Sequence, residues 1–419
     1  MNTGGEQTVA PFTLPGPASD RETAAGWARW RTTRRAFMPA PRLTSGEYRA
    51  LSPRGRMLHD LHRAATHANL AIQETPMSAA VSRVMWSRLQ NNALKHKPTT
   101  RAGLMINGGG YQGKTETACE VAAAFEDQWL DLHGQINPDA VPGTRDLLAT
   151  VAYVQTPVTA TPKSVCEAIL GFYGAPYRKM TLAQLVAVVR TSLYEHATKV
   201  LILDDVSRLR MHREADRDAL DLLRSLMSMH VTLVLIGVGI PQSGLLREGQ
   251  RSASGRWDFP AHADHTGHGD EAATQTQRRF DLVELGPFRY DTPQETAAWV
   301  AHLAGIEAQL RLLHAEPGML TAGTMPEYLF RRTGGIVGLL ERLIEDGCGH
   351  AIDTGAERLT DGLLDGLDIN LGDATGRDEA AGEVPDVPPR PATSARSKRG
   401  RARNKVFDDK GITSARESP

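Results

Sequence analysis

A glycine-rich segment constrains this chain more than any other feature. It runs from Asn107 to Glu120 and reads NGGGYQGKTETACE, with an apolar strand-like run before it and a helical pattern after it. A simple turn needs one or two glycines, so three in a row indicate that something bulky must come close to the backbone. The spacing Gly108-x-x-x-x-Gly113-Lys114-Thr115, in that context of strand and helix, is typical of a phosphate-binding loop.

Each part of such a loop has a physical task. Without Cβ atoms, the loop can turn its N–H groups toward a β-phosphate, and the following helix directs its positive end to the same place. We expect Lys114 to reach the β- and γ-phosphate oxygens and the Thr115 hydroxyl to coordinate Mg²⁺, so ATP and Mg²⁺ are the predicted cofactors. The alternative is a glycine-rich turn that binds nothing. The residues predicted to bind nucleotide are Gly108, Gly109, Gly110, Tyr111, Gln112, Gly113, Lys114, Thr115 and Glu116.

A second predicted strand supplies the acids that a phosphate loop requires. The run KVLILDD places four apolar residues, Val200 to Leu203, before Asp204 and Asp205. We expect Asp204 to hold Mg²⁺ through water, together with Thr115, and Asp205 to lie near the water that attacks the γ-phosphate. Lys114 and Asp205 are thus predicted catalytic residues. Alternatively, the two acids only cap the helix that follows them.

Strand-like and helical runs alternate after Lys97, which predicts an α/β domain over residues 98–289. Short apolar strands that alternate with helices indicate a parallel sheet covered by helices on both faces. The expected strands are Gly103–Asn107, Ala149–Gln155, Lys199–Asp204, Val231–Val238 and Phe280–Leu285. The expected helices are Lys114–Trp129, Pro162–Tyr173, Leu182–His196 and Arg213–Met229.

The pattern becomes entirely helical after Pro287. Thr292, Pro293 and Glu295 supply the N-cap, the first-turn proline and the capping-box glutamate of a helix start. Residues 290–370 therefore indicate a small all-α C-terminal lid domain.

Residues 51–97, before the α/β domain, predict two helices. These are Pro53–Ala71 and Met77–Ala93, and in the first the apolar residues Met57, Leu58 and Leu61 recur at helical spacing.

Both ends of the chain look different from its middle. Residues 1–50 are expected to form a flexible basic and aromatic arm that suits contact with nucleic acid or docking on another protein, although a solvated helix face fits equally. Residues 371–419 form an acidic and then basic tail that cannot pack but can hold polyanions. The residues concerned in the arm are Trp27, Arg29, Trp30, Arg31, Arg34, Arg35 and Phe37, and in the tail Arg396, Lys398, Arg399, Arg401, Arg403 and Lys405.

Composition bears mainly on the cellular compartment. The three cysteines, Cys119, Cys166 and Cys348, are far apart and odd in number, which fits a reducing compartment better than a disulfide framework. The N-terminus lacks the apolar segment of a secretion signal, and the longest apolar run, Val231–Pro241, is much shorter than the roughly 20 residues that cross a bilayer. We therefore expect a cytoplasmic protein without membrane association. The formal net charge of -1 does not by itself indicate nucleic acid.

The order of these features resembles that of the AAA+ ATPases, and within them the transposition ATPases of the TniB and TnsC type. The resemblance covers about Leu51 to Leu363. It depends on the order of GGGYQGKTETA, VAYVQTPVTATPKSVCEAIL, LILDDVSRL, LLRSLM, LVLIGVG, RRFDLVELGPF and RRTGGIVGLLERLIEDGCGHAI. The phosphate loop is specific for nucleotide, whereas the Gly-Pro-Phe and Thr-Gly-Gly-Ile-Val-Gly stretches are individually weak.

The resemblance implies a homo-oligomer, a ring or filament on double-stranded DNA bound without regard to sequence, with ATP at each subunit boundary. Its implied partners are a DDE transposase, which it recruits or activates, and a target-selection protein. Arg278 or Arg279 falls at the position of an arginine finger for the neighbouring subunit's γ-phosphate, or else both belong to a solvated helix end. Arg208, Arg210 and Arg213 fall where relatives face the pore and would meet DNA phosphates, although a solvated helix start fits nearly as well.

Three departures from the family pattern weaken the chemistry of hydrolysis. Asp205 stands where relatives usually have glutamate, and the shorter acid would hold the attacking water less well. Gly237 and Val238 stand where many relatives have a polar sensor, and the lid position of an arginine reads Ile336, Val337 and Gly338. We therefore expect slow hydrolysis, with ATP acting mainly as a switch for assembly.

Other interpretations stay open. The segment HADHTGHGD, with His262, His265 and His268, could be a metal site, but its Gly-rich polar setting favours a mobile insertion. An initiator or helicase-loading ATPase is a close alternative to the transposition ATPase. A nucleotide-gated signalling or defence module would be expected to add a repeat array or an effector domain, and a small-molecule kinase would need neither the lid nor the arginine pair.

Overall fold

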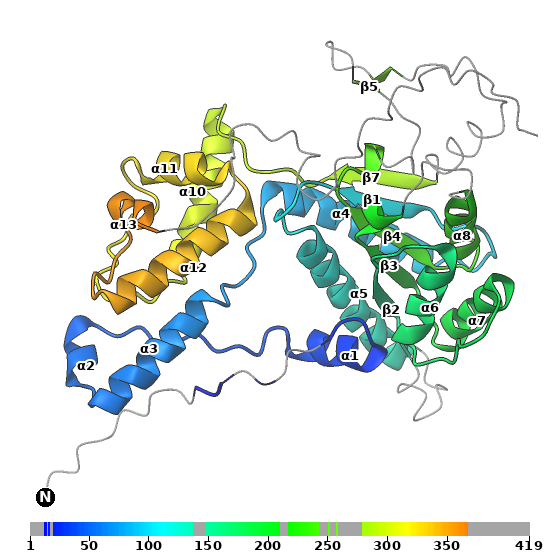
Figure 1. The fold of residues 1–419 in the computed structure, drawn as a ribbon, viewed down its shortest axis with the longest axis horizontal. Coiled ribbons are helices and arrows are strands. Elements are labelled where there is room, and N and C mark those ends of the chain that lie inside the picture. Colours follow the sequence, from blue (N-terminus) through cyan, green and yellow to red (C-terminus); the bar gives the residue numbers. More distant parts are fainter. Residues whose placement is uncertain are drawn as a thin grey trace, which may run out of the picture. The chain divides into compact units, whose positions relative to one another are not determined.

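The computed structural model describes residues 12–14, 16, 20–136, 148–209, 217–242, 250–251, 257–258 and 279–367. Within them, five parallel strands form a sheet in the order β2-β3-β4-β1-β7 (Figure 1). The predicted α/β fold class is confirmed, and each expected strand lies within two residues of its expected bounds. The strands are β1 Gly103–Asn107, β2 Val151–Gln155, β3 Val200–Asp204, β4 Thr232–Gly237 and β7 Phe280–Glu284.

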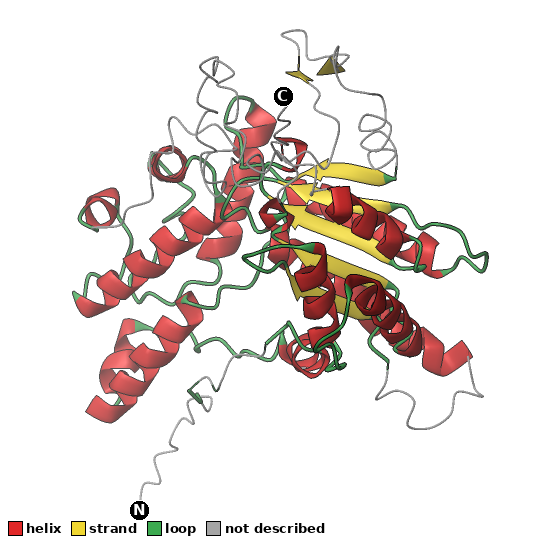
Figure 2. Cartoon of the chain, turned by 45° about the vertical axis from the view of Figure 1, so that its right-hand side comes forward, coloured by secondary structure: helices red, strands yellow, loops and turns green. Residues whose placement is uncertain are grey.

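Helices cover both faces of this sheet, as Figure 2 shows. α1, α4 and α5 lie on one face, and α6, α7 and α8 lie on the other. α5 continues beyond its expected end at Trp129, where the Gln135 amide donates to Asp131 one turn earlier at 2.9 Å. The bounds are α1 Ala24–Thr33, α4 Pro76–Ala93, α5 Lys114–Ile136, α6 Pro162–Phe172, α7 Leu182–Glu195 and α8 Arg217–Met227.

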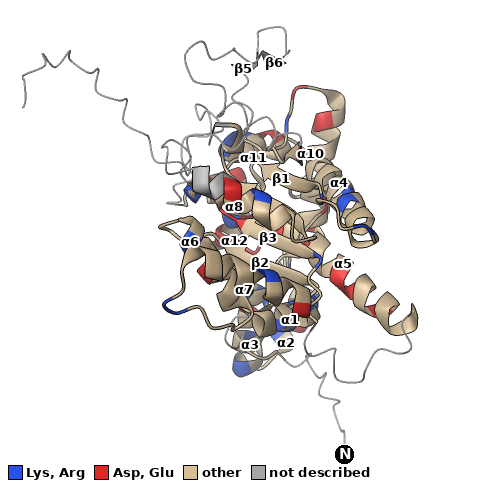
Figure 3. Ribbon diagram, turned by 90° about the vertical axis from the view of Figure 1, so that its right-hand side faces the viewer, with Lys and Arg blue, Asp and Glu red and all other residues tan. Residues whose placement is uncertain are grey.

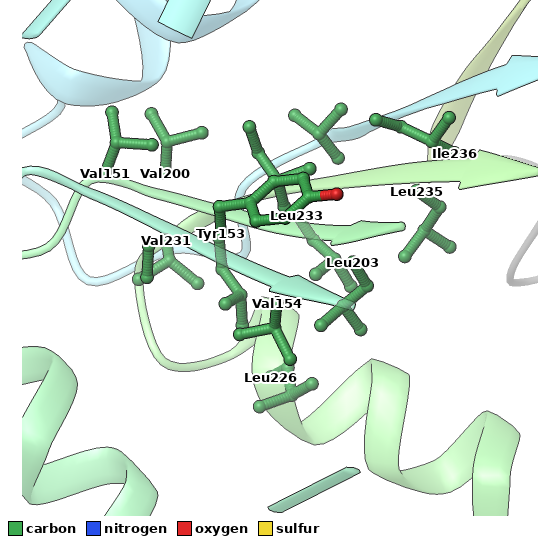
Figure 4. Close-up of a cluster of buried hydrophobic side chains, with 14 of the residues drawn as sticks. Val151, Tyr153, Val154, Val200, Leu203, Leu226, Val231, Leu233, Leu235 and Ile236 are labelled. Atoms are coloured by element: carbon green, nitrogen blue, oxygen red, sulfur yellow. The ribbon is translucent and has the colours of Figure 1, made fainter. Parts of the chain in front are cut away.

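The centre of the sheet is a continuous hydrophobic core. Every residue of β3 and β4 is buried, as expected for parallel strands covered on both faces. Figure 4 shows Val200, Leu203, Leu233 and Tyr153 in this cluster. Because all strands run parallel, the residues that follow β1 and β3 meet at one edge of the sheet.

A second hydrophobic cluster belongs to the C-terminal helices. Thr292 caps α10 and forms a capping box with Glu295, with a proline in the first turn, as the sequence predicts. The indole N–H of Trp299, which is fully buried, donates to the Pro326 carbonyl at 2.9 Å and joins α10 to α11. The helices are α10 Pro293–Glu307, α11 Met325–Thr333, α12 Val337–Asp353 and α13 Asp361–Asp365.

Helix α3, Pro53–His67, buries its polar face rather than its apolar one. Met57, Leu58 and Leu61 are 59%, 43% and 44% exposed, whereas Arg63 is 1% exposed. The Arg63 guanidinium donates to both carboxylate oxygens of Glu357, at 2.6 and 3.0 Å, and α3 packs on α12. The apolar spacing therefore predicted the helix but did not mark its buried face. The short helix α2, Ser45–Ala50, precedes it.

The expectation of a flexible arm does not hold for residues 20–50. Trp27 of α1 is buried, and its indole N–H donates to the Glu126 carboxylate of α5 at 2.6 Å. Arg31 and Arg34 form ion pairs with Asp127 of the same helix. Burial raises the pKa of Glu126, and the Trp27 hydrogen bond opposes that rise. The aromatic and basic residues of α1 thus bind the chain's own helix α5, through contacts that no local pattern reveals.

Several sequence features lie outside the described residues or in short elements. The tail at 371–419 and the segment with His262, His265 and His268 are outside.

Cys119, Cys166 and Cys348 are free thiols and buried. None of the described helices combines the length and the hydrophobicity that a membrane crossing requires. The short elements are η2 Val206–Arg208, η4 Ile240–Gln242, and the antiparallel pair β5 Gln250–Arg251 and β6 Trp257–Asp258.

Candidate nucleotide-binding site

The glycine-rich loop connects β1 to α5. Two of its positions, Gly108 and Gly113, favour glycine, the first for lack of space and the second for its backbone conformation. A Cβ on Gly108 would lie 2.2 Å from the Leu285 carbonyl oxygen, and Gly113 has a φ of 77°. Tyr111 also has a positive φ, 58°, and its side chain is 66% exposed. The buried Gln112 side-chain oxygen has no partner among the described residues. The loop is thus a tight cradle that a Cβ would fill, which fits the close backbone approach of a phosphate chain. The Gln112 oxygen is a hydrogen-bond acceptor, so it would not itself contact phosphate oxygens.

The lysine and the threonine at the start of α5 face the ends of the loop and of β3. The Lys114 ammonium donates to the Gly109 carbonyl at 2.6 Å, and the Thr115 hydroxyl donates to the Asp204 carboxylate at 2.7 Å. Asp204 is 3% exposed. A hydroxyl beside a buried carboxylate is the hard oxygen donor pair that Mg²⁺ prefers. The residues present therefore fit Mg²⁺ and a nucleotide phosphate chain, with Lys114 next to both.

Tyr153 is a residue of this site that sequence reasoning missed. Its hydroxyl donates to the same Asp204 oxygen as Thr115, at 2.8 Å. Burial, and then the nearby Asp204 charge, raise the pKa of Tyr153. Tyr153 and Gln155 are two positions apart on β2 and side by side with β3, so a polar pair at alternate positions of an otherwise apolar strand is the signal that could have found them.

The second acid, Asp205, is held by two neighbours. Its backbone is left-handed, with φ 54° and ψ 42°, which aspartate tolerates better than most residues. The Gln155 amide donates to its carboxylate at 2.6 Å, and the Arg208 guanidinium lies 3.0 Å from the same oxygen. Arg208 also donates to the Thr156 carbonyl at 2.8 Å. Arg208, which the resemblance places at a DNA contact, is thus engaged beside Asp205.

The lid helices contact the loop through backbone atoms. The Gly338 N–H donates to the Tyr111 carbonyl at 2.8 Å, and a Cβ on Gly338 would lie 2.8 Å from that oxygen. The Phe288 N–H donates to the Gly335 carbonyl at 2.9 Å. Where an arginine would stand in many relatives, the start of α12 therefore offers close backbone approach instead of a cation.

The end of β4 is filled by packing. A Cβ on Gly237 would lie 3.1 Å from a Val206 methyl group and 3.2 Å from Ile240. The nearby polar groups come from other strands, since Asn107 donates to Glu284 at 2.8 Å and accepts from the Ile240 N–H at 2.9 Å. Asn107 and Glu284 end β1 and β7, and no sequence motif marked them as site residues.

The remaining predicted site residues lie at different places. Glu116 is in the first turn of α5 and pairs with Arg21, from the segment before α1, at 2.7 Å. Arg279 precedes β7, so it lies at the edge of the sheet opposite the phosphate loop. Arg210, Arg213 and Arg278 lie outside the described residues.

Residues 99–242 match the family model of the AAA domain. Among solved structures, the chain is similar to the ORC2 protein of Aeropyrum pernix, with 14% identity, 70% of this chain and 68% of that chain covered, and a TM-score of 0.44. The ORC1 protein of Aeropyrum pernix in complex with DNA has 13% identity and a TM-score of 0.49, with 72% of this chain and 67% of that chain covered. Domain III of the replication initiation protein DnaA from Thermotoga maritima has 12% identity and a TM-score of 0.38, with 71% of this chain and 92% of that chain covered. A search of curated proteins found no match.

The domain match and the geometry agree. The matched residues include the phosphate loop and the strand that ends in Asp204, and the five-stranded parallel sheet with its helical C-terminal region is a P-loop AAA+ fold. Residues 99–242 are therefore similar to the AAA domain in sequence and fold. The more specific resemblance to the TniB and TnsC type stays a prediction.

Proposed function

We propose that this protein is a slow ATPase whose bound nucleotide controls its assembly on double-stranded DNA, where it regulates transposition by recruiting or activating a DDE transposase. One observation supports the nucleotide switch above all others. The Thr115 hydroxyl and the Asp204 carboxylate are joined at 2.7 Å, beside Lys114 and a loop in which Gly108 has no room for a Cβ. Thr115 and Asp204 would hold Mg²⁺, and Lys114 with the loop would hold the phosphates.

The arrangement around Asp205 supports slow hydrolysis. A base that orients the attacking water must have a free carboxylate oxygen within hydrogen-bond reach of that water. Gln155 and Arg208 both contact the same oxygen of Asp205 and hold the carboxylate in one orientation, so its other oxygen can orient the attacking water only where that fixed orientation directs it. Bound Mg²⁺ would neutralise charge on the phosphates, and the residues of this chain would position them.

DNA binding and self-assembly are the parts of the proposal that depend on the resemblance. Arg279 stands about one strand length, roughly 17 Å, from the end of β1, so it would act on the nucleotide of a neighbouring copy and not on its own. A homo-oligomer with nucleotide at its subunit boundaries follows from that assignment. We propose a cytoplasmic location and no membrane contact.

The proposal is tested with the full chain and the variant Lys114→Ala. Removing the ammonium that grips the outer phosphates should abolish ATP-dependent assembly on long duplex DNA, because the charge of the triphosphate loses its main counterion, while the fold is kept. The measurements are nucleotide binding by calorimetry, DNA mobility shift with ATP and with a non-hydrolysable analogue, and circular dichroism. Equal DNA assembly by the variant, or rapid hydrolysis by the native protein without DNA or partner, would contradict the proposal.

A separate observation tests the transposition role. A DDE transposase reading frame next to the gene, whose product joins the protein on DNA only with ATP, is expected. If the neighbouring genes encode a replicative helicase or its partners instead, the initiator or helicase-loader alternative replaces it.

A further inference from the structure

Within the part of the chain that the structure describes, the edge of the sheet opposite the phosphate loop carries cations without anionic partners. Lys95 and Lys97 follow α4, Arg101 precedes β1, and Lys199 precedes β3. No carboxylate among the described residues forms an ion pair with any of the four. These four residues are named the basic edge. Figure 3, with Lys and Arg in blue, shows that basic residues lie on and near α4.

Arg101 fixes the shape of the loop that follows α4. It is 4% exposed, and its guanidinium donates to the carbonyls of Lys95 at 2.8 Å and of Lys97 and Thr99 at 3.1 Å. A guanidinium that satisfies three carbonyls of one loop holds that loop in a single conformation. The side chains of Lys95, His96 and Lys97 are all exposed on it. The loop is therefore a rigid platform that presents charge outward.

Lys199, directly before β3, adds a further cation to the basic edge. Its ammonium lies 5.8 Å from the centroid of the Trp129 ring, a cation–π contact that attracts the ammonium without neutralising its charge. Burial, and then the charge of Arg101, lower the pKa of Lys199. Lys199 and Arg101 thus repel each other, and a bound anion would stabilise the pair.

We propose that the basic edge binds the phosphate backbone of double-stranded DNA. β3 and β1 are separated in the sheet only by β4, so Lys199 and Arg101 start from strands about 10 Å apart. Along the axis of a duplex, that span equals about three of the spacings, of about 3.4 Å each, between successive phosphates of one strand. Exposed lysines on a loop held by Arg101, with the neutral hydroxyls of Thr99 and Thr100 beside them, fit phosphate oxygens, whose recognition needs no base contact.

The position of the basic edge lets DNA and nucleotide bind at once. β1, a strand of five residues, separates it from the phosphate loop by about 17 Å. The basic edge is distinct from the segment with Arg208, where the family resemblance places DNA contacts. The inference rests on the proposed DNA binding and assigns to it a surface of its own.

The test compares Lys95→Gln/Lys97→Gln with the control Arg178→Gln/Arg190→Gln, which removes two exposed cations elsewhere. Duplex affinity of the full chain is measured by fluorescence anisotropy with a non-hydrolysable ATP analogue, over a series of salt concentrations. The first variant should bind duplex about tenfold or more weakly at low salt, and its plot of log K against log salt should become less steep by about 1.8, or about 0.9 for each phosphate that is no longer neutralised. Nucleotide affinity should not change. Lys199→Gln should reduce the slope by about 0.9.

Each other outcome identifies what fails. If Lys95→Gln/Lys97→Gln keeps the slope of the native protein, or if the control weakens duplex binding as much, the basic edge does not bind DNA, while DNA binding by the protein stands. If the variant changes self-association without DNA and leaves DNA affinity intact, the surface binds protein and the inference is overturned. If the native protein binds no duplex with any nucleotide, the proposed function itself fails and takes the inference with it.

Discussion

At the scale of single residues, hydrogen bonds and an ion pair connect the two acids of the site to their neighbours. Asp204 accepts from Thr115 and Tyr153, and Asp205 is contacted by Gln155 and Arg208. Gln155 and Arg208 hold the second acid through one of its two oxygens. The orientation of Asp205 toward an attacking water would thus depend on an ion pair that is 36% and 30% exposed on its two sides and hence weak.

Arg208→Gln tests that dependence. An exposed pair of this kind contributes about 0.2–1 kcal/mol, so freeing Asp205 should raise the basal ATPase rate by up to about fivefold. Asp205→Asn should lower the rate about 100-fold or more and leave nucleotide binding intact, because the amide cannot take up a proton. Steady-state phosphate release measures both, with Arg178→Gln as the control for a missing surface charge. An unchanged rate in Arg208→Gln would mean that the pair does not restrain Asp205.

At the scale of elements, glycines decide how closely the lid approaches the loop. Gly338 at the start of α12 contacts the Tyr111 carbonyl, and Gly335 accepts from the Phe288 N–H with a Cβ position only 2.4 Å from the Phe288 oxygen. The contact is made by backbone atoms, so it does not depend on charge, and side-chain volume alone would break it.

Gly338→Ala should weaken nucleotide binding. The added methyl group would lie 2.8 Å from the Tyr111 oxygen and force α12 away from the loop. We expect an affinity loss of about tenfold, corresponding to about 1.4 kcal/mol, with little change in thermal stability of the free protein. Titration calorimetry and a melting curve measure the two. Gly349→Ala, where a Cβ meets nothing within 4 Å, is the matched control on the same helix.

His302 of α10 gives the lid a pH dependence. It is buried between Phe288 and Trp299, with ring centroids 4.9 and 6.3 Å away, and neither ring nitrogen has a partner among the described residues. Burial lowers the pKa of His302 to about 4. Between pH 6.5 and about 4 the unfolded chain therefore binds a proton that the folded chain excludes, so the free energy of unfolding falls as pH falls through this window.

His302→Phe should reduce the fall in the free energy of unfolding at acid pH, because phenylalanine keeps the ring contacts and cannot take up a proton. The variant is expected to unfold at a higher temperature than the native protein at pH 5 and to differ less between pH 7 and pH 5. Burial also lowers the pKa of His67 to about 4, so His67 still lowers the free energy of unfolding of this variant as pH falls. The exposed His350→Gln should leave the pH dependence of melting as it is. A native-like pH dependence in His302→Phe would show that His302 does not contribute.

At the scale of the whole molecule, the N-terminal helices pack alternately against the α/β domain and the C-terminal helices. α1 binds α5 of the α/β domain, α3 packs on α12 of the lid, and α4 returns to the sheet. The lid is therefore tied to the α/β domain by the chain before α4 as well as by the connection after β7. Arg63, with Glu357, Asp60 and the Arg311 carbonyl as acceptors, is the main polar contact of the first tie.

Arg63→Ala should release α3 from the lid. Removing one partner of a buried ion pair leaves Glu357 uncompensated and costs about 3–5 kcal/mol. We expect a lower denaturant midpoint and faster hydrogen exchange in α3 and α12, but not in α5 or α6. Arg63→Met/Glu357→Gln should recover part of the loss, since it leaves no unpaired buried charge. Uniformly faster exchange, or none, would contradict a local tie.

Local patterns determined much of the site and fold. Continuous apolar runs and the helical patterns between them placed the five strands and their helices, because a parallel sheet covered on both faces requires continuous apolar strands. The glycine spacing and the acids after β3 predicted Lys114, Thr115 and Asp204 together, because carboxyl ends of parallel strands meet at one edge. The threonine N-cap, the first-turn proline and the capping-box glutamate at Thr292, Pro293 and Glu295 likewise predicted the start of α10.

Only the tertiary structure decided which contacts polar residues make across long sequence separations. Met57, Leu58 and Leu61 suggested an apolar inner face, yet Arg63 is buried because Glu357, 294 positions away, neutralises it. The arginines of α1 are held by α5 acids, and Tyr153 and Gln155 reach the acids of β3 because the strands are neighbours. Periodicity depends on residues a few positions apart, whereas the energy of a buried charge depends on its partner in space, which no local pattern contains.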